Sequence, residues 1–473
     1  MVTAVISVIL IYTAFSIFLG YISHKKSTGT SSEYFIADGG VSWFHLGLTI
    51  FASWFSTFGF LGSPGFFYKK GVTWFYIQGT FCMAAPIFAW FIVRRIWLLG
   101  KEKGFITPGD LLEDRFKSPA IRKLSGIISI TALLPYCLIQ IVGVGKAIEV
   151  GTSGALPYWL GVLIASIGIA LYTLLGGIKA IILTDVVQGT LFFIILTIGT
   201  ALVFYLSGGI TEGYQLAIQT RPEAFTVDTS AIGSALNLIV VWSIGYIVLP
   251  HLWQRSYMAE SAESFTKGLV LFSALTFVFI LAAMLIGTLS VGIIPELADS
   301  DKLLPQLFSS HLRWAVPLLV LGVFAAGMST MDSQLLTASS VLVRDLINPL
   351  LKESLSSKKE KLVGQVFVLT FIVLLVFLAN NEAFQGSIII LATKGTAICC
   401  LLFIPLLASL FSDKPNKWSA ILSILIGAGF YGGLETKLIE LNLPLSIGYT
   451  ITSLGLQLVV FLILDRILLT NRK

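Results

Sequence analysis

The chain has 473 residues, of which 56% are hydrophobic and 12% are charged, and its mean hydropathy is +0.90. Soluble domains carry roughly 25% charged residues, so this composition indicates a polytopic membrane protein. The connections between its apolar stretches are too short for an attached kinase, ATPase or soluble binding domain. The formal net charge of +6 would suit a nucleic-acid partner, but the distribution of the charges argues against one.

A helix needs about 20 apolar residues to cross a bilayer, and we count thirteen stretches of about this length. They are residues 3–23, 44–66, 71–97, 124–150, 156–175, 183–206, 232–254, 267–292, 314–343, 362–379, 385–411, 418–433 and 444–465. The first has no basic start and no small-residue cleavage site, so we interpret it as an uncleaved span and not as a secretory signal. The sequence therefore predicts an all-α polytopic membrane protein with about thirteen transmembrane helices.

The basic residues predict the orientation of these helices. If the N-terminus lies outside, most of the 31 Lys and Arg residues fall on the cytoplasmic side, Arg255 among them, as the positive-inside rule requires. We therefore expect a multi-pass plasma-membrane protein in the lipid bilayer, with a cytoplasmic C-terminus and no nucleic-acid partner. Lys146 and Lys394 fall within predicted spans. We expect both to reach the outer interface with their long side chains in preference to binding a carboxylate.

Two predicted spans contain residues that interrupt a helix. Residues 52–65 include three glycines, one proline and four hydroxyl residues, and residues 242–251 include Gly245 and Pro250. One kinked helix in a membrane means little, but matched breaks five spans apart predict two inverted repeats with a solute site near the midplane. The predicted division is an extra transmembrane helix and loop at 1–40, one repeat at 41–206, the second at 231–411, and two C-terminal transmembrane helices at 412–473.

Polar residues in two further spans predict an ion site. Asp185 leads directly into an apolar run, and a charge in a bilayer costs about 2.5–3.5 kcal/mol on insertion scales, so it is rarely there by accident. In the ninth span, Ser329 and Thr330 lie close to Asp332 on neighbouring positions of a helix. Ser and Thr also line tight helix contacts in membranes, but beside an acid we favour a sodium ion, which prefers oxygen ligands.

In these segments the chain resembles the sodium:solute symporter family, which includes sodium/proline, pantothenate and monocarboxylate permeases and the sodium/glucose transporters. The resemblance covers nearly the whole chain and implies a leucine-transporter-like core of two inverted five-helix repeats. The motifs that carry it are ASWFSTFGFLGSPG at 52–65, FITPGDLLEDRF at 105–116, GGIKAIILTDVVQG at 176–189, WSIGYIVLPH at 242–251 and AAGMSTMDSQLL at 325–336.

The resemblance also implies specific ion ligands. A sodium site would be built from the backbone carbonyls of Ala52, Phe55 and Ala326 and the hydroxyls of Ser329 and Thr330. In some members an acid at the position of Asp185 forms a second sodium site with ninth-span residues, here Ser329, Asp332 and Ser333. Asp332 departs from the serine or asparagine expected there. Two acids could strengthen a cation site, or one could stay protonated because like charges raise a pKa, so sodium and proton both stay open.

Residues of the seventh span suggest where the solute binds. Trp242, Tyr246 and Pro250 match an aromatic and proline set that lines the solute pocket of proline-transporting members. Trp54 stands where those members carry an aspartate, which puts proline itself in doubt. The predicted solute-binding set also includes Ser56, Thr57 and Gln78. The helix N-termini at the breaks suit anionic groups, so a small organic carboxylate such as a monocarboxylate, pantothenate or an amino acid is the preferred solute.

The predicted function is secondary active transport, in which sodium drives symport of a small organic solute by alternating access. Na⁺ is the coupling ion, and we expect no cofactor and no obligatory protein partner. The alternatives are a proton-coupled symporter of the same fold and a transporter-like sensor. An enzyme is not expected, because none of the four histidines lies near a second ligand at useful spacing.

Overall fold

The computed structural model of the chain describes residues 1–25, 30–440 and 448–470 and consists almost entirely of helices. The α-helices are α1 (Val2–Lys25), α2 (Ser31–Ile36), α3 (Trp43–Trp54), α4 (Ser63–Lys70), α5 (Val72–Lys103), α6 (Pro108–Phe116), α7 (Pro119–Gly151), α8 (Tyr158–Ser207), α9 (Ile210–Thr220), α10 (Ile232–Val248), α11 (Pro250–Ser256), α12 (Ala262–Ile293), α13 (Leu303–His311), α14 (Val316–Val341), α15 (Ser357–Ala379), α16 (Ile388–Cys400), α17 (Phe403–Phe411), α18 (Lys417–Glu435) and α19 (Tyr449–Thr470). Two π-helical segments, η2 (Phe58–Gly62) and η7 (Leu342–Ile347), continue α-helices. The short 3-10 segments are η1 (Ala37–Gly39), η3 (Pro222–Phe225), η4 (Thr229–Ala231), η5 (Ser300–Lys302), η6 (Arg313–Ala315), η8 (Asn348–Leu350) and η9 (Glu382–Phe384).

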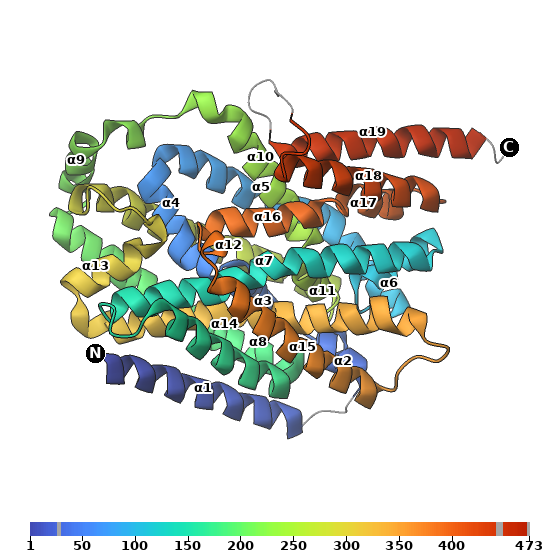
Figure 1. Cartoon of the computed structure of the whole chain (residues 1–473), viewed down its shortest axis with the longest axis horizontal. Helices are drawn as coiled ribbons and strands as arrows, with labels where there is room; N and C mark the ends of the chain where they lie inside the picture. Colours follow the sequence, from blue (N-terminus) through green and yellow to red (C-terminus); the bar gives the residue numbers. More distant parts are fainter. Residues whose placement is uncertain (26–29, 441–447, 471–473) are drawn as a thin grey trace.

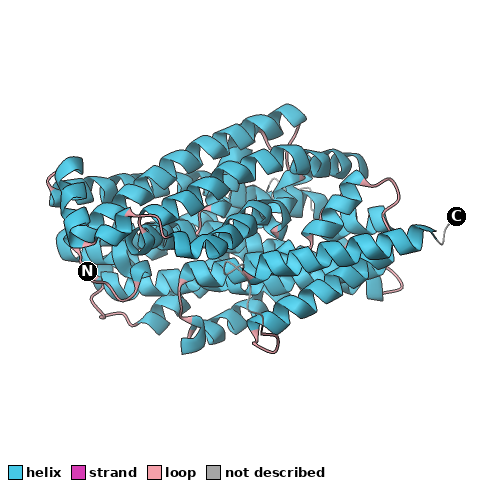
Figure 2. Ribbon diagram, turned by 90° about the horizontal axis from the view of Figure 1, so that it is seen from above, coloured by secondary structure: helices cyan, strands magenta, loops and turns pink. Residues whose placement is uncertain are grey.

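The long helices run along the longest axis of the molecule, and α1 begins at one end while α19 finishes at the other (Figure 1). The view from above shows the same alignment (Figure 2). Among the described residues, ten helices are long and apolar enough to cross a membrane. Two bent helix pairs and the shorter apolar helix Tyr158–Leu174 correspond to the other predicted spans. The first residues of the predicted span 444–465 lie outside the described residues.

α14, which carries most of the candidate ion ligands, is among the most enclosed helices. In the most apolar windows of α14 and α7, 78% and 72% of the residues are buried, against 28% in α1 and 22% in α19. α14 packs against both α7 and α8, and α1 and α19 lie along opposite edges of the bundle (Figure 1). The polar residues of α14 therefore face protein and not lipid.

Both predicted helix breaks are confirmed. α3 ends at Trp54 because Phe55 has φ −91° and ψ 76°, and the chain re-enters a helix through η2 and α4. The two parts are bent by 61°. Leu249 is extended, with φ −62° and ψ 122°, as residues before a proline prefer to be. Consequently α10 and α11 meet at Pro250 with a bend of 48°.

A third irregularity positions Asp185. Gly177 has φ 62° and ψ 179° inside α8, a conformation that a residue with a Cβ rarely adopts. A Cβ there would also lie 2.8 Å from Cδ2 of Tyr34. The kink divides α8 into the two predicted spans and places Asp185 about two helical turns beyond it.

Candidate ion and solute site

The predicted ligands of the first sodium site come together where α14 passes the end of α3. The Ser329 hydroxyl donates to the Ala52 carbonyl at 2.9 Å and to the Ala326 carbonyl at 3.0 Å. The Thr330 hydroxyl donates to the same Ala52 carbonyl at 3.3 Å. Phe55 follows directly as the residue that ends α3, and all five residues are buried. Oxygen atoms from two distant segments are thus in direct contact inside the protein.

The break in the first helix pair is attached to α7 through Thr57. Its backbone N–H donates to Oε1 of Gln140 at 3.3 Å, and its hydroxyl lies 3.0 Å from both that oxygen and the Ile139 carbonyl. The two helices touch closely here, since a Cβ at Gly143 would lie 2.8 Å from Cβ of Thr57. The Thr57 hydroxyl is therefore engaged with α7, and a solute contact at this residue stays a prediction.

Asp185, Asp332 and Ser333 also converge, but an arginine lies among them. Arg255 is only 1% exposed, and its Nη2 is 2.6 Å from the Ser333 hydroxyl and 3.4 Å from Oδ2 of Asp185. Its Nε donates to the Thr49 hydroxyl at 3.2 Å, and that hydroxyl in turn donates to Asp185. The Ser333 hydroxyl lies 3.1 Å from Oδ1 of Asp332. Arg255, which the sequence analysis counted among the charges of the cytoplasmic side, is thus buried inside the protein.

The helix break explains why Arg255 lies inside the protein. α11 starts at Pro250 and has only seven residues, so Arg255 is little more than one turn from the break. At that depth the guanidinium reaches residues of α3, α8 and α14. The hydropathy pattern suggests that Arg255 lies at the end of a span, because charged residues usually mark the ends of membrane helices.

Lys146, which was expected to extend to the outer interface, is also buried, and it is ion-paired within the protein. Its side chain is 4% exposed, and its ammonium lies 2.9 Å from Oδ2 of Asp301, which also accepts the Ile388 N–H at 3.0 Å. Burial raises the pKa of the Asp301 carboxyl above its ordinary value, and the neighbouring Lys146 opposes this shift. The pair joins η5 to α7 and α16. Lys394, in contrast, is half exposed and pairs with Glu435 at 2.9 Å.

The predicted aromatic solute residues line the junction of the two broken helices. The Trp242 ring stacks on Phe58 with centroids 4.6 Å apart, and it meets Trp54 edge-on at 5.8 Å. Tyr246 lies 5.4 Å from Trp54. Trp54, which stands where proline-transporting members are expected to carry an acid, therefore contributes an apolar surface between both helix pairs. Pro250 starts the second half of the second broken helix.

Several buried polar groups near these rings have no hydrogen-bond partner among the described residues. They are Nε1 of Trp242, Nε2 of Gln78, the Tyr136 hydroxyl and both ring nitrogens of His251. The Tyr136 ring lies 6.3 Å from the Trp242 ring and 5.7 Å from the His251 ring. The sequence did not single out Tyr136 as a binding residue, since nothing in its own segment marks it. The Ser56 hydroxyl, in contrast, accepts the Phe58 N–H at 3.1 Å.

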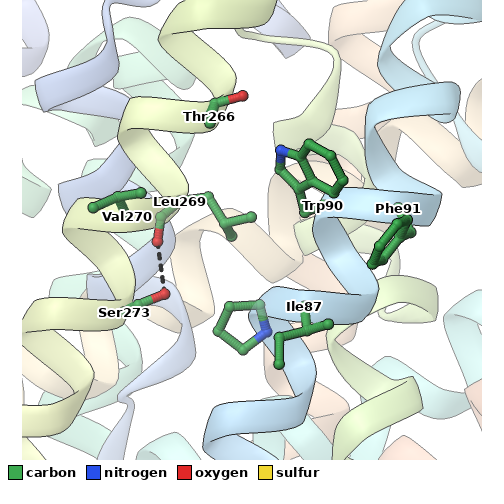
Figure 3. A pocket seen from close by; sticks show the side chains of 8 residues that line it. Ile87, Trp90, Phe91, Thr266, Leu269, Val270 and Ser273 are labelled. Carbon is green, nitrogen blue, oxygen red and sulfur yellow. Dashed lines mark hydrogen bonds between the residues drawn. The ribbon is translucent and has the colours of Figure 1, made fainter.

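A groove on the outside of the bundle is unlike this central region. It has a volume of about 320 Å³ and lies between α5 and α12, where Ile87, Trp90 and Val270 are exposed (Figure 3). Its two hydroxyl groups, on Thr266 and Ser273, donate to carbonyls of their own helix. The groove therefore presents an apolar surface suited to lipid chains.

Comparisons with known proteins identify the family. The sequence profile of the sodium:solute symporter family matches residues 34–427. The chain belongs to this family. It is 27% identical over 445 residues to the sodium/pantothenate symporter of Haemophilus influenzae, covering 89% of this chain and 88% of that one. It is 25% identical over 421 residues to the high-affinity proline transporter PutP of Bacillus subtilis, covering 87% and 88%. Sodium-coupled solute symport is thus the supported class of function.

Solved structures support the fold. A Na⁺-coupled sialic acid symporter in a substrate-bound, outward-open state superposes with a TM-score of 0.78 at 18% identity, covering 98% of this chain and 97% of that one. MhsT in complex with L-phenylalanine gives 0.56 at 16% identity, covering 89% and 98%. The chain has the leucine-transporter-like fold with two inverted five-helix repeats, as the resemblance implied.

Proposed function

We propose that this symporter carries a small organic carboxylate and binds sodium between the end of α3 and α14. The observation that carries the proposal is the shared Ala52 carbonyl, which accepts hydrogen bonds from Ser329 at 2.9 Å and from Thr330 at 3.3 Å. A carbonyl at the end of a broken helix and two hydroxyls provide the oxygen ligands that a hard cation prefers. The ion would link α3 to α14 and so couple binding to the movement of a broken helix.

The unpartnered donors beside the aromatic rings support a carboxylate as solute. Nε1 of Trp242 and Nε2 of Gln78 are donors that lack an acceptor among the described residues, and an anionic oxygen accepts such hydrogen bonds strongly. The apolar ring of Trp54 favours a solute with an apolar body, and it supplies no carboxylate of the kind that proline-transporting members are expected to carry at this position. Pantothenate fits this description, and it is the solute named for the Haemophilus influenzae relative.

One sodium ion supplies enough energy for concentrative uptake. When one sodium ion enters together with one carboxylate anion, the net charge moved is zero, so the membrane potential contributes nothing. A tenfold sodium gradient then supplies about 1.4 kcal/mol, which supports an accumulation of about tenfold. The same proposal includes the division into repeats at 41–206 and 231–411 and an N-terminus on the outer side. In this arrangement the two broken helices would have opposite orientations around the ion.

Uptake into proteoliposomes tests the proposal. Purified protein would be reconstituted and supplied with radiolabelled pantothenate, with labelled proline and lactate in parallel, under an inward sodium gradient. We expect pantothenate uptake that stops when choline replaces sodium. Uptake that persists in choline and follows an inward proton gradient would instead favour proton coupling through the buried acids Asp185 and Asp332, each of which has one oxygen without a partner among the described residues.

A further inference from the structure

Arg255 lies where the sequence predicts a second cation. Two of its contacts, Oδ2 of Asp185 at 3.4 Å and the Ser333 hydroxyl at 2.6 Å, belong to the residues expected to hold a second sodium ion or a proton. The third expected residue, Asp332, is close enough to interact electrostatically with both Asp185 and Arg255. A cation provided by the chain itself is therefore present among these oxygens.

The surroundings of Arg255 match the requirements of a permanent charge. An arginine stays protonated in proteins, and a buried ion needs a counter-charge and hydrogen bonds to offset its desolvation. Arg255 has Asp185 as counter-charge, and its N–H groups also donate to the Thr49 hydroxyl at 3.2 Å and the His251 carbonyl at 3.3 Å. The His251 carbonyl belongs to the same helix as Arg255, but the other partners come from other segments. The charge is therefore held by tertiary contacts.

The sum of the buried charges limits how many further cations can enter. Asp185, Asp332 and Arg255 are all 1% exposed or less. With both acids ionised their charges sum to −1, and one sodium ion restores neutrality. With Asp332 protonated the sum is zero. Before the solute binds, two sodium ions would leave excess positive charge in the low-dielectric interior in either protonation state, which is costly.

We propose that the Arg255 guanidinium takes the place of a second coupling cation, so that the protein binds one sodium ion, at Ser329 and Thr330. This inference rests on the proposed sodium symport and adds its stoichiometry. The ion site and the guanidinium are neighbours, because the Ser333 hydroxyl that Arg255 contacts also lies 3.1 Å from the Ser329 carbonyl. Removing the guanidinium should therefore open a second site lined by two acids without altering the ligands of the first.

Sodium binding can be counted without knowing the solute. The full-length protein in lipid nanodiscs would be titrated with radioactive sodium in choline buffer and the bound ions counted per protein. We expect one ion for the wild type and two for Arg255→Met, with one again for the double variant Arg255→Met/Asp185→Asn. Arg255→Lys should keep one ion because the charge is retained. Arg95→Met is the matched control, since Arg95 is an exposed arginine that stacks on Phe411, and it should also bind one.

The outcomes separate this inference from the proposed function. Two ions bound by the wild type would overturn the role of Arg255 while leaving sodium symport in place. One ion bound by a folded Arg255→Met, with unchanged half-saturation, would overturn it as well. If that variant does not purify as a folded protein, the wild-type count decides, and one ion whose half-saturating concentration rises in Ser329→Ala supports the inference. A wild type that binds no sodium would overturn the proposed function itself.

Discussion

Replacement of Ser329 by alanine tests the proposed ion site most directly. The size of the expected loss of sodium affinity follows from the contacts of its hydroxyl. With sodium bound, the lost hydroxyl removes an interaction with a charged group, which contributes about 1.5–3 kcal/mol. Without sodium, it removes the neutral hydrogen bond to the Ala52 carbonyl at 2.9 Å, which contributes about 0.5–1.5 kcal/mol. The difference of about 1.4 kcal/mol is a tenfold loss of affinity. The Thr330 hydroxyl, 3.3 Å from the same carbonyl, keeps the site from being abolished.

The effect is measured as sodium-dependent thermal stabilisation of the purified protein, because a ligand that binds only the folded state raises the melting temperature with its concentration. For Ser329→Ala we expect the half-saturating sodium concentration to rise about tenfold. Ser166→Ala is the control, because this buried serine on α8 donates only to the Val162 carbonyl of its own helix, at 2.8 Å. If Ser329→Ala and Ser166→Ala both respond to sodium as the wild type does, the hydroxyl is not a ligand.

Three further variants test other parts of the structure. Gly177→Ala should destabilise the protein by roughly 1–3 kcal/mol, because φ 62° with ψ 179° is a conformation that essentially only glycine adopts. Gly189→Ala, on the same helix with nothing within 4 Å of a new Cβ, should leave the melting temperature unchanged or raise it slightly. Lys146→Met should cost about 3–5 kcal/mol in unfolding free energy by stranding Asp301, and the double variant Lys146→Met/Asp301→Asn should recover most of it; no recovery would show that the pair is not coupled. Trp242→Ala should weaken solute uptake about tenfold or more while sodium binding stays intact, whereas unaltered solute affinity would remove Trp242 from the pocket.

The breaks, and the proximity of the residues proposed as ion ligands, could be predicted because their cause is local. Pro250 forces the preceding residue out of the helix wherever it occurs, and the hydroxyls of Ser329 and Thr330 lie on one face of any helix. The sequence also predicted which spans are interrupted, because glycine and proline are costly in a membrane helix. Residues whose positions depend only on one helix and one break could thus be placed from the local pattern and from the resemblance.

The positions of the buried cations could not be predicted in the same way. Arg255 is 70 positions from Asp185, and Lys146 is 155 from Asp301, so no local pattern contains either pair. Hydropathy treats a basic residue near the end of a span as a surface charge. One indication was available: two acids inside apolar spans need a counter-charge, and Arg255 stood one position beyond the end of the predicted seventh span.

The attachment of Thr57 to α7 has a mechanical consequence. Because Thr57 is hydrogen-bonded to Ile139 and Gln140, the bent helix can pivot at this residue, with α3 on one side and α4 on the other. The arm formed by α3 has 12 residues and is roughly 18 Å long, so a swing of about 10° would displace its far end by about 3 Å. Atoms within about 5 Å of the pivot would move by less than about 1 Å. Such a pivot would let the far end of α3 move while the backbone around Phe55, a proposed ion ligand, stays nearly in place.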